Sequence, residues 1–183
     1  MDCGINPLYQ GLNYIPKNFL YDSRIEQFII PNNITSIGYA AFYYCTSLTS
    51  ITIPNSVKNI YAFSFSNCSS LKNIEIPNSV MSISYNTFDS CNSLINVVVG
   101  DNVWSIENEA FINCSNLKNI EIPNSVKIIG KGAFSNCSNL KEIIFKGTKE
   151  EAIICGIGEK AFKNWREGSS IEKIICTDGI VKL

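Results

Sequence analysis

The chain contains no histidine among its 183 residues, and this absence removes much of the usual catalytic chemistry. Without histidine there is no ordinary general base near neutral pH and no Ser-His or Cys-His nucleophile pair. A zinc site would need thiolates alone, and the sequence has no CxxC pair. We therefore expect no catalytic residue, no metal and no cofactor, and an enzymatic function ranks behind the other classes.

Carboxylates are the remaining candidates for catalysis. Glu75 and Glu121 stand two repeat periods apart in one column, so they would lie about 10 Å from each other on the strand spacing. Each follows a lysine by three residues, Lys72 and Lys118 respectively. Such pairs are best explained as a solvated face, with a small contribution from surface pairing.

Charge is also scarce, at 17 % of the residues, and it is balanced at 15 basic against 16 acidic side chains. The lysines alternate with glutamates instead of clustering, so no field attracts a polyanion and nucleic acid is not expected as a partner. The hydrophobic content of 45 %, in contrast, is sufficient for one folded domain with a sizeable core.

Long apolar runs are absent as well. No stretch approaches the length of about 20 residues that a membrane span needs, so we expect no membrane insertion. The first residues, MDCGINPLYQGLNYIP, lack the basic start and apolar core of a secretory signal peptide. From these features we expect a cytoplasmic protein, or one that is exported by a non-classical route.

What the chain has in abundance is repetition. The pentapeptide IPNSV occurs at residues 53–57, 76–80 and 122–126, at separations of 23 and twice 23. A fixed period of this length is typical of a solenoid or propeller. Three of the columns that keep this period are Leu48, Leu71, Leu94, Leu117 and Leu140; Phe42, Phe65, Phe88, Phe111 and Phe134; and Cys45, Cys68, Cys91, Cys114 and Cys137.

Each repeat predicts one three-sided coil. Segments such as LKNIEIP alternate apolar and polar residues up to a proline, which is typical of a short strand with one buried face. Proline ends the strand because it lacks an N–H, and the following Asn-Ser turns the chain. The next V-x-x-I step predicts a second side, and the small residue before phenylalanine predicts a tight, partly helical third side. Because one coil cannot bury its own apolar edge, equivalent residues must stack into ladders.

The consensus LxxIxIPxxVxxIGxxAFxxCxxL resembles the BspA-like class of leucine-rich repeats over residues 12–145, and residues 143–151 and 171–179 look like the closing segments of such arrays. The resemblance implies an α/β leucine-rich-repeat solenoid: a curved, right-handed stack of coils with a parallel β-sheet on the concave face, and short second strands and short helical turns on the other sides. We expect a single domain over residues 1–183, with an N-terminal cap at 1–24, repeats at 25–147 and a C-terminal cap at 148–183. Within that cap, the insertion 148–170 is expected to be helical.

Three departures from the consensus are informative. Ser64-Phe65 replaces the usual small-Phe pair and Phe63 is an extra aromatic, so the third side of that coil is expected to pack differently. VVVGDNV replaces IxIPNSV at residues 97–103 and gives up the proline. Asp22 occupies the cysteine column in the first coil, as expected for a cap that faces water.

The eight cysteines do not indicate a metal or disulfide framework. Five stand in one column, where small buried hydrophobes are expected, and parallel stacked side chains seldom reach the disulfide dihedral angle. Cys3, Cys155 and Cys176 lie outside the column, and a bridge between Cys155 and Cys176 stays an open alternative. Glycosylation sequons occur, and three of the four are interpreted as turns, with a glycan relevant only in a secreted form: Asn33, Asn67, Asn113 and Asn136.

Function is predicted on the outward side of the strands, where residues can vary without harming the ladders. In the middle, Ile95 and Val98 form an apolar spot between lysines and glutamates, which is typical of an interface centre with a polar rim. The hypothesis is that this surface binds a protein or peptide, and a merely solvated sheet weighs equally. The candidate partner-binding residues are Asn73, Glu75, Ile95, Asn96, Val98, Lys118, Asn119 and Glu121.

Two functional classes follow. The resemblance implies a non-enzymatic protein–protein interaction module, adhesin-like and at the cell surface, because BspA-like proteins are associated with binding host or matrix proteins. The missing export signal favours instead an intracellular scaffold, or a structural segment of a larger assembly without a dedicated ligand. The sequence leaves the identity of the ligand and the oligomeric state open.

Overall fold

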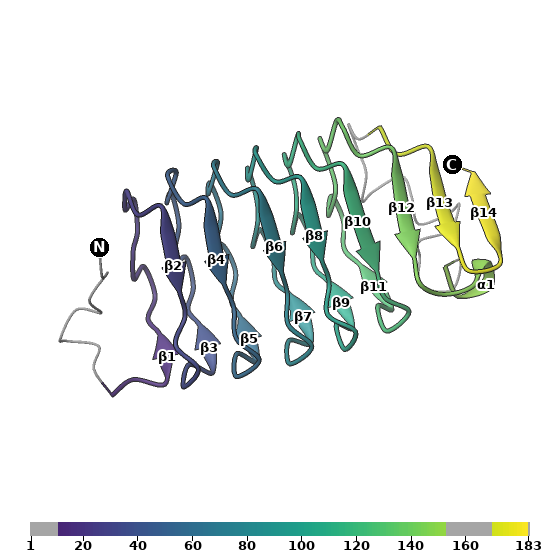
Figure 1. Cartoon of the computed structure of the whole chain (residues 1–183). Coiled ribbons are helices and arrows are strands. Elements are labelled where there is room, and N and C mark those ends of the chain that lie inside the picture. The colour runs from purple at the N-terminus through teal and green to yellow at the C-terminus, as the bar shows by residue number, and fades with distance from the viewer. Residues whose placement is uncertain (1–10, 153–169, 183) are drawn as a thin grey trace.

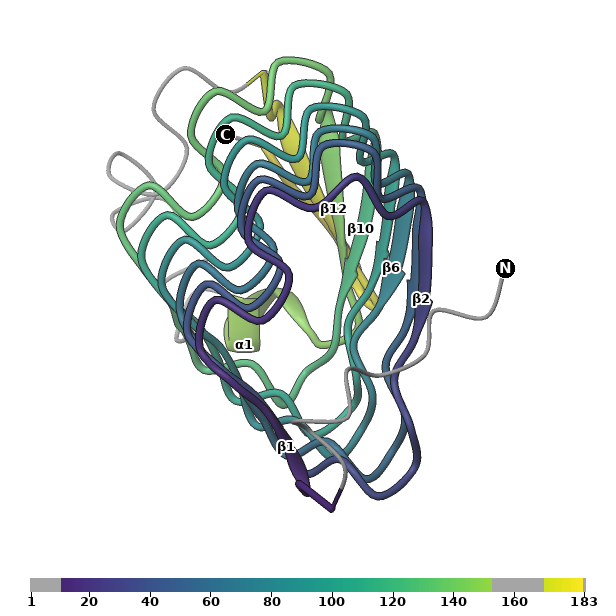
Figure 2. The same cartoon turned by 90° about the vertical axis from the view of Figure 1, so that its left-hand side faces the viewer.

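The computed structural model describes residues 11–152 and 170–182, which form a stack of coils along one axis (Figure 1). Seen down that axis, each coil is rotated slightly relative to the one before (Figure 2). A typical coil has a strand on its first side, a shorter strand on its second and turns on its third. The fold class predicted from the repeat, a leucine-rich-repeat solenoid with parallel sheets, is therefore confirmed.

The first side of each coil contributes one strand to what we call the major sheet. Its strands are β2 (Gln27–Ile29), β4 (Ser50–Thr52), β6 (Asn73–Glu75), β8 (Asn96–Val98), β10 (Asn119–Ile122) and β12 (Glu142–Phe145). Hydrogen-bonded neighbours pair in parallel one repeat apart, for example Ile74 with Val97. From β2 to β10 the second residue is buried and the residues on either side of it are exposed, as the alternating pattern predicts.

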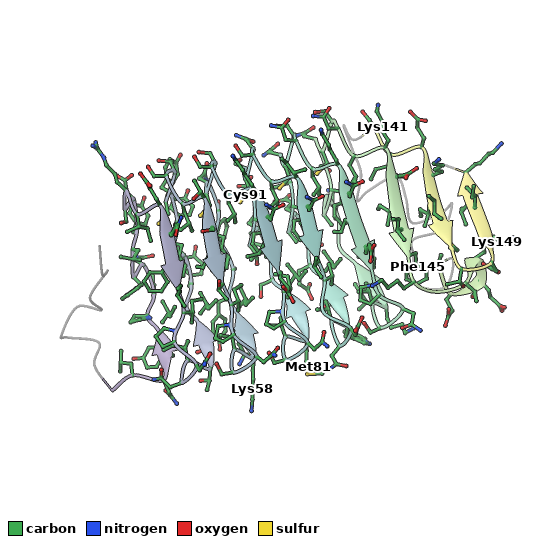
Figure 3. All side chains as sticks on the ribbon, viewed as in Figure 1. Lys58, Met81, Cys91, Lys141, Phe145 and Lys149 are labelled. Atoms are coloured by element: carbon green, nitrogen blue, oxygen red, sulfur yellow. The ribbon has the colours of Figure 1, made fainter. Side chains whose placement is uncertain are left out.

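The second side carries strands of only two residues each. They are β1 (Tyr14–Ile15), β3 (Ser36–Ile37), β5 (Asn59–Ile60), β7 (Ser82–Ile83), β9 (Ser105–Ile106) and β11 (Ile128–Ile129). The isoleucine of each of these strands from β1 to β9 is buried, and in β11 Ile129 is partly buried while Ile128 is exposed. Figure 3 shows Lys58 and Met81 projecting outward from this side. Each of these two-residue strands thus contributes one side chain to the core.

The third side consists of turns, and its described residues form no helix, so the helical turns expected there are absent. Backbone amides alternate between two partners. The Ala41 N–H donates to Gly38 O within the coil at 3.2 Å, and the Phe42 N–H donates to Ser64 O in the next coil at 2.8 Å. Two positions in each coil have positive φ, and this alternation sends every second N–H along the stack instead of into a helix. Positive φ of 60° to 61° at three sequons confirms their interpretation as turn residues: Asn67, Asn113 and Asn136.

Side chains of one column contact their counterparts through the middle of the stack. The five phenylalanine rings have centroid separations of 5.2 to 5.5 Å and interplanar angles of 3° to 7°. Leu71, Leu94 and Leu117 are fully buried, one in each of three successive coils. Burying one phenylalanine contributes about 1.5–3 kcal/mol, so the five rings of this ladder together contribute about 8–15 kcal/mol of hydrophobic stabilisation.

Both sheets are interrupted at one level, between β4 and β6 and between β5 and β7, which we call the interruption. The turns of the third side stay bonded across it, with the Phe65 N–H donating to Thr87 O at 3.0 Å. The Ser84 hydroxyl also bridges it, donating to Ile60 O at 2.6 Å. The two halves of the stack are therefore joined at this level by the core, the turns and side chains, without a sheet bridge.

The C-terminal end closes the major sheet. After β12, Thr148 and Glu151 form a capping box at the start of α1 (Lys149–Ala152): the Glu151 N–H donates to Thr148 Oγ1 at 3.2 Å, and the Thr148 N–H donates to Glu151 Oε2 at 2.8 Å. The remainder of the expected helical insertion, with Cys155, lies outside the described residues. β13 (Lys173–Cys176) then pairs in parallel with β12, and β14 (Gly179–Lys182) pairs antiparallel with β13.

Candidate functional site

The structure brings all eight predicted binding residues together on three adjacent strands. Asn73, Asn96 and Asn119 form one row in register across β6, β8 and β10. Glu75, Val98 and Glu121 form a second row two residues further along. Ile95 and Lys118 come directly before β8 and β10. Figure 1 shows these strands side by side in the middle of the stack. We call this surface the sheet face.

The asparagine row is tied together by its own side chains. Asn96 Nδ2 donates to Asn73 Oδ1 at 3.0 Å, and Asn119 Nδ2 donates to Asn96 Oδ1 at 3.3 Å. The signal for this ladder was present in the sequence, because asparagine recurs there at the repeat period. The row is therefore preordered, and a partner that meets it contacts amides whose orientation is already set.

The two apolar residues at the centre of the sheet face differ in how far they are exposed. Val98 is 55 % exposed, whereas Ile95 is half-buried at the entry to the strand. Val98 lies between the two carboxylates Glu75 and Glu121 in its row, and Ile144 of β12 continues the row beyond Glu121. An exposed valine between carboxylates thus marks the middle of the candidate site.

The charge pairing differs from the expected one. Glu121 pairs with Lys146 at 3.0 Å, a lysine that follows β12, and among the described residues it makes no ion pair with Lys118. Lys118 stands at the entry to β10 and Glu121 further along it, whereas Lys146 emerges from the neighbouring strand near the carboxylate. The hydrogen bond that Lys146 donates to the Glu121 carboxylate raises the pKa of Lys146. In the described part of the chain Glu75 forms no ion pair. The two carboxylates on either side of Val98 therefore differ, since Glu121 is paired with a lysine and Glu75 is not.

A pocket next to Glu75 was not predicted from the sequence. It has a volume of about 600 Å³ and is open to solvent. It lies where β4 and β6 separate, and no sequence signal marks it because the flanking coils share the same IPNSV corner. Its lining residues are Asn32, Ile51, Thr52, Ile53, Pro54, Asn55, Ser56, Glu75 and Pro77.

The cysteine column lies inside the stack and carries no site chemistry. Each thiol donates to a backbone carbonyl of the preceding coil, for example Cys91 Sγ to Phe65 O at 3.2 Å. Burial raises the pKa of the Cys45 thiol to about 11 and that of Cys137 to about 12. A buried thiol of high pKa is a poor nucleophile and a poor metal ligand. The interpretation of these five cysteines as a ladder of small buried side chains is confirmed.

Within residues 11–152 and 170–182, no group of three or more Cys, Asp or Glu side chains is arranged to hold a metal ion. Over the same residues, no helix has the length and apolarity that crossing a bilayer requires.

Comparison with known proteins defines the class to which the fold belongs. A family model for the BspA type leucine rich repeat region matches residues 13–141 and 105–183, in six copies. The chain therefore belongs to the BspA-type leucine-rich repeat family. The sequence has no match among curated proteins.

Solved structures of bacterial leucine-rich repeat proteins are similar to this chain. The leucine rich repeat protein of T. pallidum is 32 % identical with a TM-score of 0.70, over 73 % of this chain and 64 % of that protein. A leucine rich cell surface protein of Faecalibacterium prausnitzii is 31 % identical with a TM-score of 0.56, over 73 % of this chain and 43 % of the other. A leucine-rich repeat protein of Bacteroides ovatus is 27 % identical with a TM-score of 0.61, over 90 % and 45 % respectively. The chain thus aligns with less than two thirds of each of these proteins.

Proposed function

We propose that this protein is a non-enzymatic protein-binding module and that the sheet face is its binding surface. The observation that carries the proposal is Val98, which is exposed on a regular strand with a carboxylate in register on either side. Binding surfaces commonly combine an apolar centre with a polar rim, and Val98 with Glu75, Glu121 and the asparagine row has that composition.

The surroundings of Val98 support a protein partner over a small ligand. The asparagine amides are held in a row along the strands, so they suit an extended surface more than a compact molecule. The pocket beside Glu75 offers room for one side chain of a partner at the edge of this surface. Pairing with Lys146 neutralises Glu121, which leaves Glu75 as the carboxylate that a basic group of the partner would meet.

We also propose that the protein acts at the cell surface in an adhesin-like role. The support is the Faecalibacterium prausnitzii protein, which is called a leucine rich cell surface protein. Protease treatment of intact cells tests this location. Digestion of the protein while a cytoplasmic marker survives would support it, and protection until the cells are lysed would favour the intracellular scaffold.

The double substitution Val98→Glu with Ile95→Lys tests the binding surface. Wild-type and variant proteins are used to capture partners from the native source, and the captured proteins are compared by mass spectrometry. Ile29→Glu is a matched control, because Ile29 is exposed on β2 of the same side but lies outside the site. We expect wild type and Ile29→Glu to retain a common partner that the double variant loses, with little change in Tm. Retention of that partner by the double variant would place the binding surface elsewhere.

A further inference from the structure

A second surface stands out on the third side of the N-terminal coils, away from the sheet face. Six rings form one connected group, which we call the aromatic cluster: Tyr21, Tyr39, Tyr43, Tyr44, Phe63 and Tyr85. Tyr43 contacts Tyr21 at 5.2 Å, Tyr44 at 4.8 Å and Phe63 at 6.5 Å. Phe63 in turn contacts Tyr39 at 5.5 Å and Tyr85 at 5.3 Å.

The rings of the aromatic cluster are accessible. Four of the tyrosines are between 43 % and 55 % exposed, and Tyr43 and Phe63 are partly buried beneath them. This is a different set from the internal phenylalanine ladder, which continues undisturbed from Phe42 to Phe65 at 5.2 Å. A contiguous exposed aromatic surface spread over four coils is typical of an interaction site.

The fold does not need these rings. The turn geometry of the third side repeats in the C-terminal coils, where no equivalent position is aromatic and all but Ile112 hold small or polar residues. Tyr39 and Tyr85 correspond to Asn108 and Lys131, one and two coils on from Tyr85. Because the same backbone forms with and without aromatics, stacking of the coils does not explain why the rings gather at one end.

Two of the rings are held at a conformational cost. Tyr44 and Phe63 have φ of 60° and 59°, the left-handed region that bulky side chains rarely adopt. In the next coil Asn67 replaces Tyr44 and Asn86 replaces Phe63, and asparagine tolerates this conformation far better than an aromatic residue does. Backbone strain that the fold does not require indicates a function when the strained residues lie together on one surface.

The charges at the aromatic cluster are mainly acidic. The pKa of Tyr85 is raised mainly by the hydrogen bond between its phenol and the Glu109 carboxylate, and the pKa of Tyr43 mainly by burial. Asp89 raises the pKa of both tyrosines further. The chain itself supplies one cation here, since Lys17 Nζ lies 5.4 Å from the centroid of the Tyr39 ring. In the described part of the chain no cation lies over the five other rings.

We propose that the aromatic cluster binds a lysine- or arginine-rich segment of a partner protein. The faces of tyrosine rings attract ammonium and guanidinium groups, as Lys17 over Tyr39 illustrates, and Asp89 and Glu109 add carboxylates at the C-terminal edge. The spread of rings over successive coils suits several basic side chains of one extended segment. The aromatic cluster is separate from the sheet face, so this proposal is independent of the function proposed above.

The test measures binding of a fluorescent peptide, (Lys-Gly)5, by anisotropy at low salt, against (Glu-Gly)5 as the acidic counterpart. The main variant combines Tyr44→Asn with Phe63→Asn, which installs the asparagine that the next coil has at each of these positions, Asn67 and Asn86. We expect the folded state to keep or gain thermal stability while peptide affinity falls roughly tenfold or more, since two ring contacts are removed. Trp104→Asn is the control, because Trp104 is equally exposed on the second side, outside the cluster.

A second variant leaves all six rings in place. Asp89→Asn with Glu109→Gln should weaken the peptide severalfold and reduce the salt dependence of binding. The proposal is overturned if (Lys-Gly)5 binds wild type and the Tyr44→Asn, Phe63→Asn protein equally, if (Glu-Gly)5 binds as well as (Lys-Gly)5, or if neither peptide binds. Binding of a neutral oligosaccharide such as cellohexaose in preference to the basic peptide would also overturn it, and would indicate a carbohydrate surface instead.

Discussion

The buried cysteine ladder predicts that the protein loses stability steeply above about pH 9. Burial holds the pKa of every ladder thiol above its ordinary value, and the least shifted of those with a defined value, Cys45, still reaches about 11. In the unfolded chain the same thiols ionise near about pH 8.5. Between these values the unfolded chain releases protons that the native state retains, so rising pH favours unfolding.

The magnitude follows from the number of thiols. Each contributes a slope that approaches about 1.4 kcal/mol of lost stability per pH unit once the unfolded thiol is fully ionised, and five of them approach about 7 kcal/mol per pH unit. The stabilising contribution is complete below the unfolded pKa and disappears as the pH rises toward the native value. A domain of this size is commonly stable by only about 5–15 kcal/mol, so the ladder alone would unfold it within about two pH units above 9.

Urea unfolding at several pH values between 8 and 10, in the presence of a reductant, measures this slope. Lysines and tyrosines also titrate, so the decisive comparison is with a variant that carries Cys91→Ala and Cys114→Ala. That variant is expected to be less stable at pH 8, because two buried side chains are truncated, but its stability should fall by about 2 kcal/mol less per pH unit, averaged between pH 8 and 10. Equal slopes in the two proteins would show that the thiols ionise in the native state and would refute the reasoning.

Two further predictions concern the packing of the coils. Ser64 is fully buried and its hydroxyl has no hydrogen-bond partner among the described residues, whereas Ala41, Ala110 and Ala133 fill the same column elsewhere, so Ser64→Ala should stabilise the protein by about 1 kcal/mol. A lower midpoint of urea unfolding in that variant would contradict this. Peptide-resolved hydrogen exchange should be faster in the strands that border the interruption, β4 to β7, than in β8 and β10, because they lack a sheet partner on one side. Uniform exchange along the stack would show that the interruption has no energetic consequence.

The strands and the core could be predicted from the sequence because stacking forces equivalent residues into contact. A column such as Leu71, Leu94 and Leu117 must be buried in every coil, so the same residue type recurs in the sequence at the repeat period. The outward positions Asn73, Glu75 and Val98 followed directly, since alternation along a strand determines which residues face out.

The third side could not be predicted in the same way. Its left-handed positions are filled by residues as different as Ala40, Phe63 and Glu109, and a glycine occupies one of them only at Gly132. No single residue type marks the conformation, so the small-Phe pair was interpreted as helical. The interruption and the pairing of Glu121 with Lys146 were also not predicted. The coils on either side of the interruption share the IPNSV corner, and Lys146 stands in a column where the other coils have proline or glycine, so the repeat gives no signal for either feature.

The two surfaces differ in how far the fold itself explains them. Hydrogen bonds between amides of successive coils account for the asparagine row of the sheet face, so that row is favoured by stacking even without a partner. The aromatic cluster has a weaker explanation of this kind, because Phe63 adopts a strained backbone where Asn86 and Gly132 of later repeats fit better. Substitutions at the neighbouring residues Phe63 and Ser64 can distinguish packing from binding as the reason for the aromatic ring. Ser64→Ala should raise stability and leave (Lys-Gly)5 binding unchanged, whereas Phe63→Asn should relieve strain and weaken binding. A ring retained only for packing would give the opposite result: Phe63→Asn would destabilise the coil and leave the peptide bound.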